Sequence, residues 1–152
     1  MKSYLALATL ISALSFTAAP DTSAHCQVPC GIYSDETVLI DLQTHQKTIA
    51  KAMDQINTLS KDAGKNAHQI TRWITNKEEH ASKIQDTMCQ YFLAQRLKPS
   101  EMSDNKESYL KKLTLAHKII VLAMKCKQTA DTENAKYLEA AIASFTQAYK
   151  TK

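Results

Sequence analysis

The sequence predicts an all-α protein, an antiparallel up-down-up-down bundle of four helices. The chain of 152 residues contains only two glycines and three prolines, so few positions favour a turn. Beyond residue 34, apolar residues recur every three or four positions in four long stretches, which short polar segments separate. Such amphipathic helices gain most of their stability by packing their apolar stripes together, and a four-helix bundle with short connections achieves this.

The first helix is expected to begin at the capping candidates Ser34 and Asp35 and to end near Gly64. Ser and Asp side chains accept hydrogen bonds from the unpaired N–H groups at a helix start, and glycine is common just past a helix end. The inward stripe of this helix is expected to contain Val38, Leu42, Ile49, Met53, Ile56 and Leu59.

Three further helices are expected over about residues 66–95, 105–127 and 132–149, and Pro99 is expected to stop the first of these. The inward residues of the second helix are expected to be Ile70, Trp73, Ile74, Ala81, Ile84, Met88 and Phe92. Those of the third helix are expected to be Leu110, Leu113, Ala116, Ile120 and Ala123. Those of the fourth are expected to be Leu138, Ile142, Phe145 and Tyr149.

Residues 1–24 are typical of a secretory signal peptide. A positive charge precedes an apolar stretch from Tyr4 to Phe16, and small residues follow up to Ala24. A membrane-spanning helix needs roughly 20 mostly apolar residues, and this stretch is shorter. We therefore expect cleavage after Ala24, an exported protein that is periplasmic or secreted, no stable membrane association after cleavage, and one domain over residues 25–152.

The remaining ionisable residues give little functional signal. The net charge is +4 and the basic residues are scattered, which is not the pattern of a nucleic-acid-binding protein. No Glu-x-x-His pair of the kind that binds metals inside helix bundles occurs. The sequence offers no clustered partners for His45, His68 and His117, which we interpret as structural or exposed. The candidate chemistry therefore lies before the first helix.

Cleavage after Ala24 would make His25 the first residue, with a free amino group. That amine and the Cys26 backbone nitrogen can close a five-membered chelate ring around a metal ion, and the same nitrogen and the Cys26 thiolate can close a second. A short turn brings the Cys30 thiolate as a fourth donor. Two nitrogens and two thiolates in one plane favour Ni(II) or Cu(II) over tetrahedral zinc. The His25 imidazole can add an axial ligand, and we expect a redox centre.

Residues 25–33, with the pattern H-C-x-x-P-C-G-x-Y, resemble the nickel hook of nickel-containing superoxide dismutases. The resemblance implies a four-helix bundle with an N-terminal metal-binding hook, assembled as a homohexamer. It also implies one nickel ion per subunit, which alternates between Ni(II) and Ni(III) while superoxide becomes dioxygen and hydrogen peroxide. The metal ligands implied are His25, Cys26 and Cys30, and Tyr33 is implied to lie beside the open axial position.

The resemblance extends into the expected helices. Asp41 and His80 match positions whose side chains support the axial imidazole in the family. Lys98, in Leu97-Lys98-Pro99, is a candidate for drawing superoxide towards the metal. Two departures from the family pattern concern the surroundings of the hook: Gln27 stands where many members carry Asp, and Arg96-Leu97 replaces Tyr-Phe.

Two other functions fit the residues. The same hook could serve an exported, non-catalytic bundle that binds nickel or copper, which would bind metal without dismutation. Alternatively, Cys26 and Cys30 could form a disulfide in a secreted bundle that binds another protein. Thiol titration would identify that case. Cys89 and Cys126 lie on expected helices and either pair across the bundle or remain buried thiols.

Overall fold

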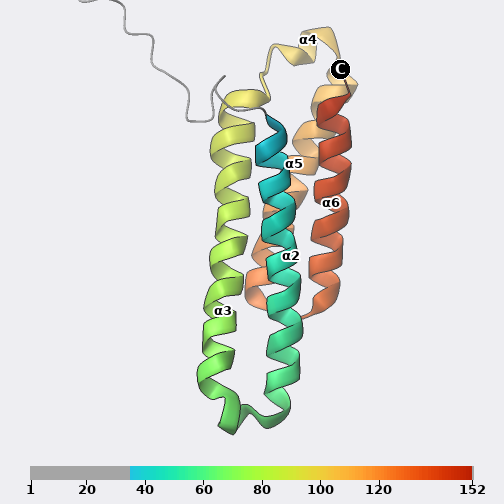
Figure 1. Ribbon diagram of the computed structural model, residues 1–152. Helices are drawn as coiled ribbons and strands as arrows, with labels where there is room; N and C mark the ends of the chain where they lie inside the picture. The colour runs from blue at the N-terminus through green and yellow to red at the C-terminus, as the bar shows by residue number, and fades with distance from the viewer. Residues whose placement is uncertain (1–34, 152) are drawn as a thin grey trace, which may run out of the picture.

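The computed structural model describes residues 35–151, and all regular structure in this range is helical (Figure 1). The four long helices are α2 (Asp35–Leu59), α3 (Ala63–Asp86), α5 (Lys106–Gln128) and α6 (Thr132–Lys150). Three shorter elements join them: the 3-10 helix η1 (Ser60–Asp62), the π-helix η2 (Thr87–Arg96) and the single-turn α4 (Glu101–Asp104). The all-α prediction is confirmed. The predicted leader, the hook and Ser34 lie outside the described residues.

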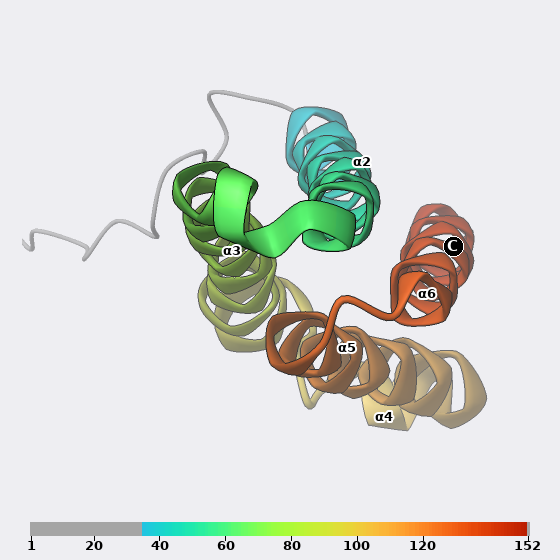
Figure 2. The ribbon, with the colours of Figure 1, turned by 90° about the horizontal axis from the view of Figure 1, so that it is seen from below.

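The four long helices stand at the corners of a bundle, as Figure 2 shows along its axis. α2 packs against α3 and α6, and α5 packs against the same two helices. The start of α2 lies beside the end of α6, where Lys150 Nζ is 2.7 Å from Glu36 Oε2. The end of α2 lies beside the segment before α6, where Asn57 Nδ2 donates to the Ala130 carbonyl at 3.0 Å.

The apolar stripes of the four helices form one continuous core. Near the end of the bundle that carries Asp35, hereafter the Asp35 end, the rings of Phe92, Phe145 and Tyr149 pack together with centroid distances between 4.9 and 5.8 Å. Full burial of a phenylalanine side chain, as at Phe92 and Phe145, contributes about 1.5–3 kcal/mol. The largest fully buried side chains include Leu39, Leu42, Ile49, Met53, Ile84, Met88, Phe92, Ile119, Leu138, Ile142 and Phe145. Most of the predicted stripes of α2 and α6 are therefore confirmed.

Gly64 does not end the first helix. α2 ends at Leu59, the chain turns through η1, and Gly64 lies in the first turn of α3. A Cβ atom at Gly64 would meet no atom within 4 Å, so the fold does not require glycine there. The turn is stabilised instead by Asn66, whose Nδ2 donates to the carbonyls of Leu59 and Asp62 at 3.2 and 3.0 Å.

The first turns of α3 extend beyond the end of α5, which Figure 1 shows at the lower end of the bundle. Lys77 marks the limit, because its side chain reaches the carbonyls at the end of α5. The residues of α3 before Lys77 therefore lie beside α2 but have no α5 to pack against. Ile70 and Trp73 are half-buried and Ile74 is 38% exposed, so their prediction as inward core residues was wrong.

The register of α5 also differs from the prediction by one residue in places. Leu110 is 39% exposed, while its neighbour Tyr109 is buried. Ile120 is half-buried, while Ile119 is fully buried.

Cys89 in η2 and Cys126 in α5 are free thiols. Within residues 35–151, no helix is both long and apolar enough to cross a membrane.

Candidate functional site

Asp35, the first described residue, is held by side chains from two other elements, η2 and α6. Tyr91 donates its hydroxyl proton to Asp35 Oδ1, and Tyr149 donates to Oδ2 at 2.7 Å. Arg96 Nη2 is 3.1 Å from Oδ1 and donates to the Tyr91 hydroxyl at 2.8 Å. We call these four residues the Asp35 cluster. It ties the start of α2 to η2 and to the last turn of α6.

The π-helix explains how Tyr91 and Arg96 reach the same carboxylate. In an α-helix, residues five apart point in directions about 140° apart around the axis. A π-helix bonds each residue to the fifth along, which brings such residues towards one face. The Leu97 N–H accordingly donates to the Phe92 carbonyl at 2.9 Å, and the Arg96 guanidinium lies 4.7 Å from the centre of the Tyr91 ring. Arg96, noted as a departure from the family pattern, therefore has a structural partner.

Electrostatics keep Asp35 ionised. Burial by itself would raise the pKa of Asp35, but hydrogen bonds from Tyr91 and Tyr149 and the charge of Arg96 outweigh it and lower the pKa. Burial and the adjacent carboxylate in turn raise the pKa of Tyr91 and of Tyr149, so both hydroxyls remain donors. A carboxylate in the first turn of α2 also interacts favourably with the helix dipole.

Lys98, the predicted superoxide-guiding residue, follows η2 at the Asp35 end. Its side chain is exposed, and its backbone N–H donates to Glu101 Oε1 at 2.9 Å. Glu101 is also paired with Lys112 from α5. The amide of Lys98 is therefore fixed at the start of α4, while its ammonium group projects into solvent.

The structure places His80 against a residue that the sequence did not single out. His80 of α3 and His45 of α2 face each other, with their Nδ1 atoms 2.9 Å apart. The interpretation of His45 as a residue without a clustered partner was wrong, because only the packing of α2 on α3 joins two positions 35 residues apart. Asp41 is exposed one helical turn before His45, and its charge acts to raise the pKa of His45.

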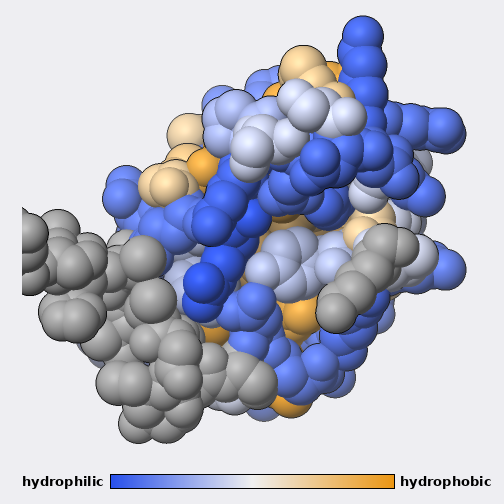
Figure 3. Space-filling view, turned by 90° about the horizontal axis from the view of Figure 1, so that it is seen from above, coloured by the Kyte–Doolittle hydropathy of each residue, from blue (hydrophilic) through white to orange (hydrophobic). Residues whose placement is uncertain are grey.

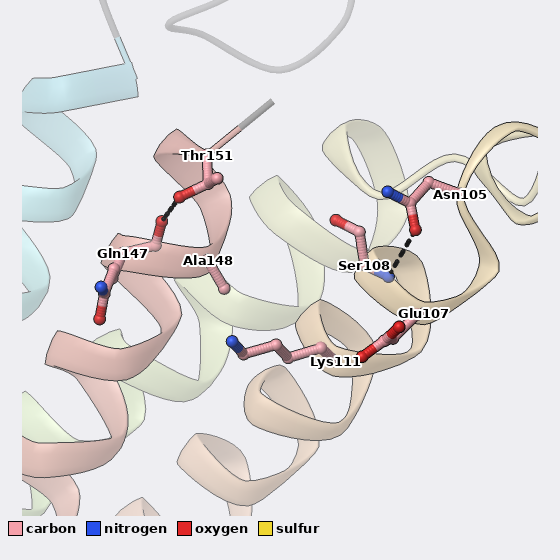
Figure 4. Close-up of a pocket in the computed structure, with 7 residues that line it drawn as sticks. All are labelled: Asn105, Glu107, Ser108, Lys111, Gln147, Ala148 and Thr151. Carbon is pink, nitrogen blue, oxygen red and sulfur yellow. Dashed lines mark hydrogen bonds between the residues drawn. The ribbon is translucent and has the colours of Figure 1, made fainter.

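The surface of the Asp35 end is largely hydrophilic, with apolar side chains visible between the helices (Figure 3). A hollow of about 400 Å³ opens there between the start of α5 and the end of α6 (Figure 4). Its lining consists of Asn105, Glu107, Ser108, Lys111, Gln147, Ala148 and Thr151. None of these seven residues is a histidine or cysteine, the donors that suit nickel or copper best, and the hollow therefore does not resemble a metal site.

Over residues 35–151, no three or more His, Cys, Asp or Glu residues are grouped so as to hold a metal ion. The predicted ligands His25, Cys26 and Cys30, and the predicted catalytic residue Tyr33, lie outside the described range. Residues 20–152 match the profile of a family described as nickel-containing superoxide dismutase. The chain belongs to the nickel-containing superoxide dismutase family. Comparison with curated proteins and with solved structures gave no match.

Membership of the nickel-containing superoxide dismutase family establishes the kind of chemistry. The activity is that of a superoxide dismutase, an oxidoreductase whose substrate is superoxide, and nickel is the cofactor. The family resemblance seen in the sequence is thereby confirmed. The match begins before His25 and ends at the last residue, so it includes both the hook residues and the whole helical part.

Proposed function

We propose that this protein is an exported superoxide dismutase whose nickel ion is bound by residues 25–33 after cleavage behind Ala24. The observation that carries the proposal is the family match, because residues 20–152 include the entire hook pattern. The proposed domain organisation is a cleaved signal peptide over residues 1–24 and a dismutase domain over residues 25–152. Signal cleavage would make the protein periplasmic or secreted.

The donor set suits nickel. His25 supplies its terminal amine and imidazole, Cys26 its backbone nitrogen and thiolate, and Cys30 a second thiolate. Nitrogen and sulfur donors that share a plane favour Ni(II) and Cu(II) over Mg or Zn. When bound, nickel would supply a Ni(II)/Ni(III) couple, which is the one-electron chemistry that dismutation of superoxide requires. The net reaction converts two superoxide ions and two protons into dioxygen and hydrogen peroxide.

The helical part contributes a fixed attachment point for the hook. Tyr33, which we propose lies beside the open axial position, precedes Asp35 by only two residues in the chain. The Asp35 cluster immobilises that end of α2 through hydrogen bonds to both carboxylate oxygens. Pre-organised attachment reduces the conformational entropy that must be lost when a metal orders the hook.

Other residues assist without binding the metal. We assign Asp41 and His80 to the support of the His25 imidazole, because partners of this kind orient a ligand ring and tune the metal. Lys98 projects a positive charge into solvent at the Asp35 end and would raise the local concentration of an anionic substrate.

The proposed assembly is the homohexamer of the family, built from up-down-up-down bundles, with one nickel ion per subunit. The contacts of α2 with α3 and α6, and the pairing of the start of α2 with the end of α6, support that topology. Exposed apolar side chains, including Ile74 and Leu110, are available for burial between subunits.

The test is metal analysis, N-terminal sequencing and electron paramagnetic resonance on one sample of exported protein. We expect His25 as the first residue, about one nickel per chain and a rhombic Ni(III) signal. A variant with one alanine inserted before His25 should remain folded and lose nickel, since the chelate needs the terminal amine. Copper or no metal on a correctly cleaved chain would contradict the proposal, as would normal activity in the variant with the insertion.

A further inference from the structure

His45 and His80 form a directly hydrogen-bonded pair between α2 and α3. Their Nδ1 atoms are 2.9 Å apart, their ring centroids are 4.9 Å apart, and the rings meet at 70°. Both side chains are half-buried. Two ring nitrogens at this distance need one proton between them, so one Nδ1 donates and the other accepts.

This contact constrains the other nitrogen of each ring. In a neutral pair, the ring that donates through Nδ1 has a bare Nε2, while the ring that accepts through Nδ1 carries its proton on Nε2. Burial, the neighbouring ring and Lys83 lower the pKa of His45, although Asp41 raises it. Burial and Lys83 likewise lower the pKa of His80, although Glu79 raises it. Both shifts favour the neutral rings, and the Nδ1–Nδ1 contact then makes one Nε2 a donor and the other an acceptor.

The pair also lies close to the other proposed support of the hook. Asp41 and His45 are four residues apart and share one face of α2. They lie about 9 and 15 Å along the helix from Asp35, given a rise of about 1.5 Å per residue. Asp41 is exposed, so this face combines an accessible carboxylate with the histidine pair.

We propose that His45 is a positioning residue of the nickel site, because its hydrogen bond fixes the tautomer and ring orientation of His80, which supports the His25 imidazole. The inference rests on the proposed function and extends it to a residue that does not touch the metal ligands. A precise metal site requires that the side chains supporting its ligands are themselves held in one orientation.

The first measurement needs no metal. Imidazole ¹⁵N chemical shifts in nickel-free protein distinguish a protonated from a bare nitrogen. We expect complementary tautomers for His45 and His80 in the wild type, and a mixture of tautomers for His80 in His45→Leu. His45→Gln, whose amide can still bond His80, should retain a single tautomer. Identical His80 shifts in the wild type and in His45→Leu would overturn the proposal.

The second measurement connects the pair to the metal. In the Ni(III) spectrum, an axial ¹⁴N ligand splits the resonance into three lines. We expect His45→Leu to bind as much nickel as the wild type but to broaden or lose this splitting, with turnover about tenfold lower. His45→Gln should rescue both properties, and His68→Leu, an exposed histidine on α3, should change neither. If His45→Leu does not fold, His45→Ala takes its place.

The outcomes separate the two proposals. A wild-type protein without nickel or a Ni(III) signal would overturn the proposed function, and the role of His45 with it. A normal wild-type spectrum that is unchanged in His45→Leu would overturn only the role of His45.

Discussion

The hydroxyl of Tyr149 donates a 2.7 Å hydrogen bond to Oδ2 of Asp35, two residues that lie 114 positions apart in the chain. This bond joins the last turn of α6 to the first turn of α2. Asp35, two residues after the proposed hook, is therefore fixed by the C-terminal turn of the last helix. Destabilising the C-terminal turn should accordingly affect metal binding, although the turn contains no proposed ligand.

Asp35→Ala should destabilise the fold and weaken nickel binding. The substitution leaves the Tyr91 and Tyr149 hydroxyls and the Arg96 guanidinium without their common acceptor, and hydrogen bonds to a charged group contribute about 1.5–3 kcal/mol each when buried. Because Asp35 is 34% exposed, we expect the free energy of unfolding to fall by only about 2 kcal/mol in total. Urea denaturation and nickel titration measure the two effects. Asp54→Ala, at an exposed position of α2, is the matched control, and equal losses in both variants would contradict the role of the Asp35 cluster.

Acid should remove the contribution of Asp35. Its pKa is lower in the folded state than the ordinary value of about 3.9, so the unfolded chain binds the proton first as the pH falls. The stabilisation is therefore complete above about pH 4 and is lost as the pH falls through the folded-state pKa. The difference in unfolding free energy between the wild type and Asp35→Asn should shrink from pH 6 to pH 2. A difference that stays constant over this range would show that the carboxylate charge is irrelevant.

Lys77→Met should destabilise the bundle without changing the nickel content. Lys77 is 3% exposed, and its ammonium group donates to the carbonyls of Cys126, Lys127 and Thr129 at the end of α5. Loss of the donor leaves these carbonyls without that partner, at a cost of roughly 3 kcal/mol. Thermal unfolding and hydrogen exchange at the end of α5 report the effect. Lys65→Met, at an exposed position of α3, should be neutral. Equal stability of the two variants would refute this explanation.

The two helical cysteines should differ in reactivity. Burial raises the pKa of the Cys126 thiol to about 11, whereas Cys89 is half-buried. Because the thiolate is the reactive form, iodoacetamide at pH 8 should label Cys89 before Cys126 in folded protein. A Cys26→Ser, Cys30→Ser double variant leaves only these two thiols, and mass spectrometry identifies the site. Preferential labelling of Cys126 would show that the core opens readily.

Lys98→Met should lower kcat/KM about threefold at low ionic strength, and the effect should vanish in high salt. The side chain is exposed, so its charge acts at long range and is readily screened. Lys106→Met, also exposed, is the control for a general loss of positive charge. A loss of rate that persists in high salt would indicate direct contact of Lys98 with the substrate instead of steering.

The periodicity of the sequence predicted the helices well but did not always select the buried face. In α5, Tyr109 and Leu110 are adjacent apolar residues, as are Ile119 and Ile120, and a stripe can be drawn through either member of each pair. Packing against α3 and α6 decides which member is buried. On α3, periodicity could not show that Ile74 lies beyond the end of α5.

For the candidate site, too, the sequence identified some residues and not others. The hook pattern is local in the sequence, so His25, Cys26 and Cys30 could be identified without a structure, and the family match supports the assignment. His45 could not, because its partner belongs to another helix. Arg96 looked like a simple departure from the family pattern, and only the register of η2 shows that it meets Asp35.

The π-helical hydrogen bonding of η2 makes the Asp35 cluster sensitive to insertions and deletions in this segment. A π-helix has more residues per turn than an α-helix and therefore contains more residues over the same length. η2 spans ten residues. Deleting one of the residues 87–90 would allow the segment to close as an α-helix, in which Tyr91 and Arg96, still five positions apart, would point about 140° away from each other and only one of them could lie beside Asp35. η2 should therefore accept many substitutions on its outer face and yet reject a single deletion before Tyr91.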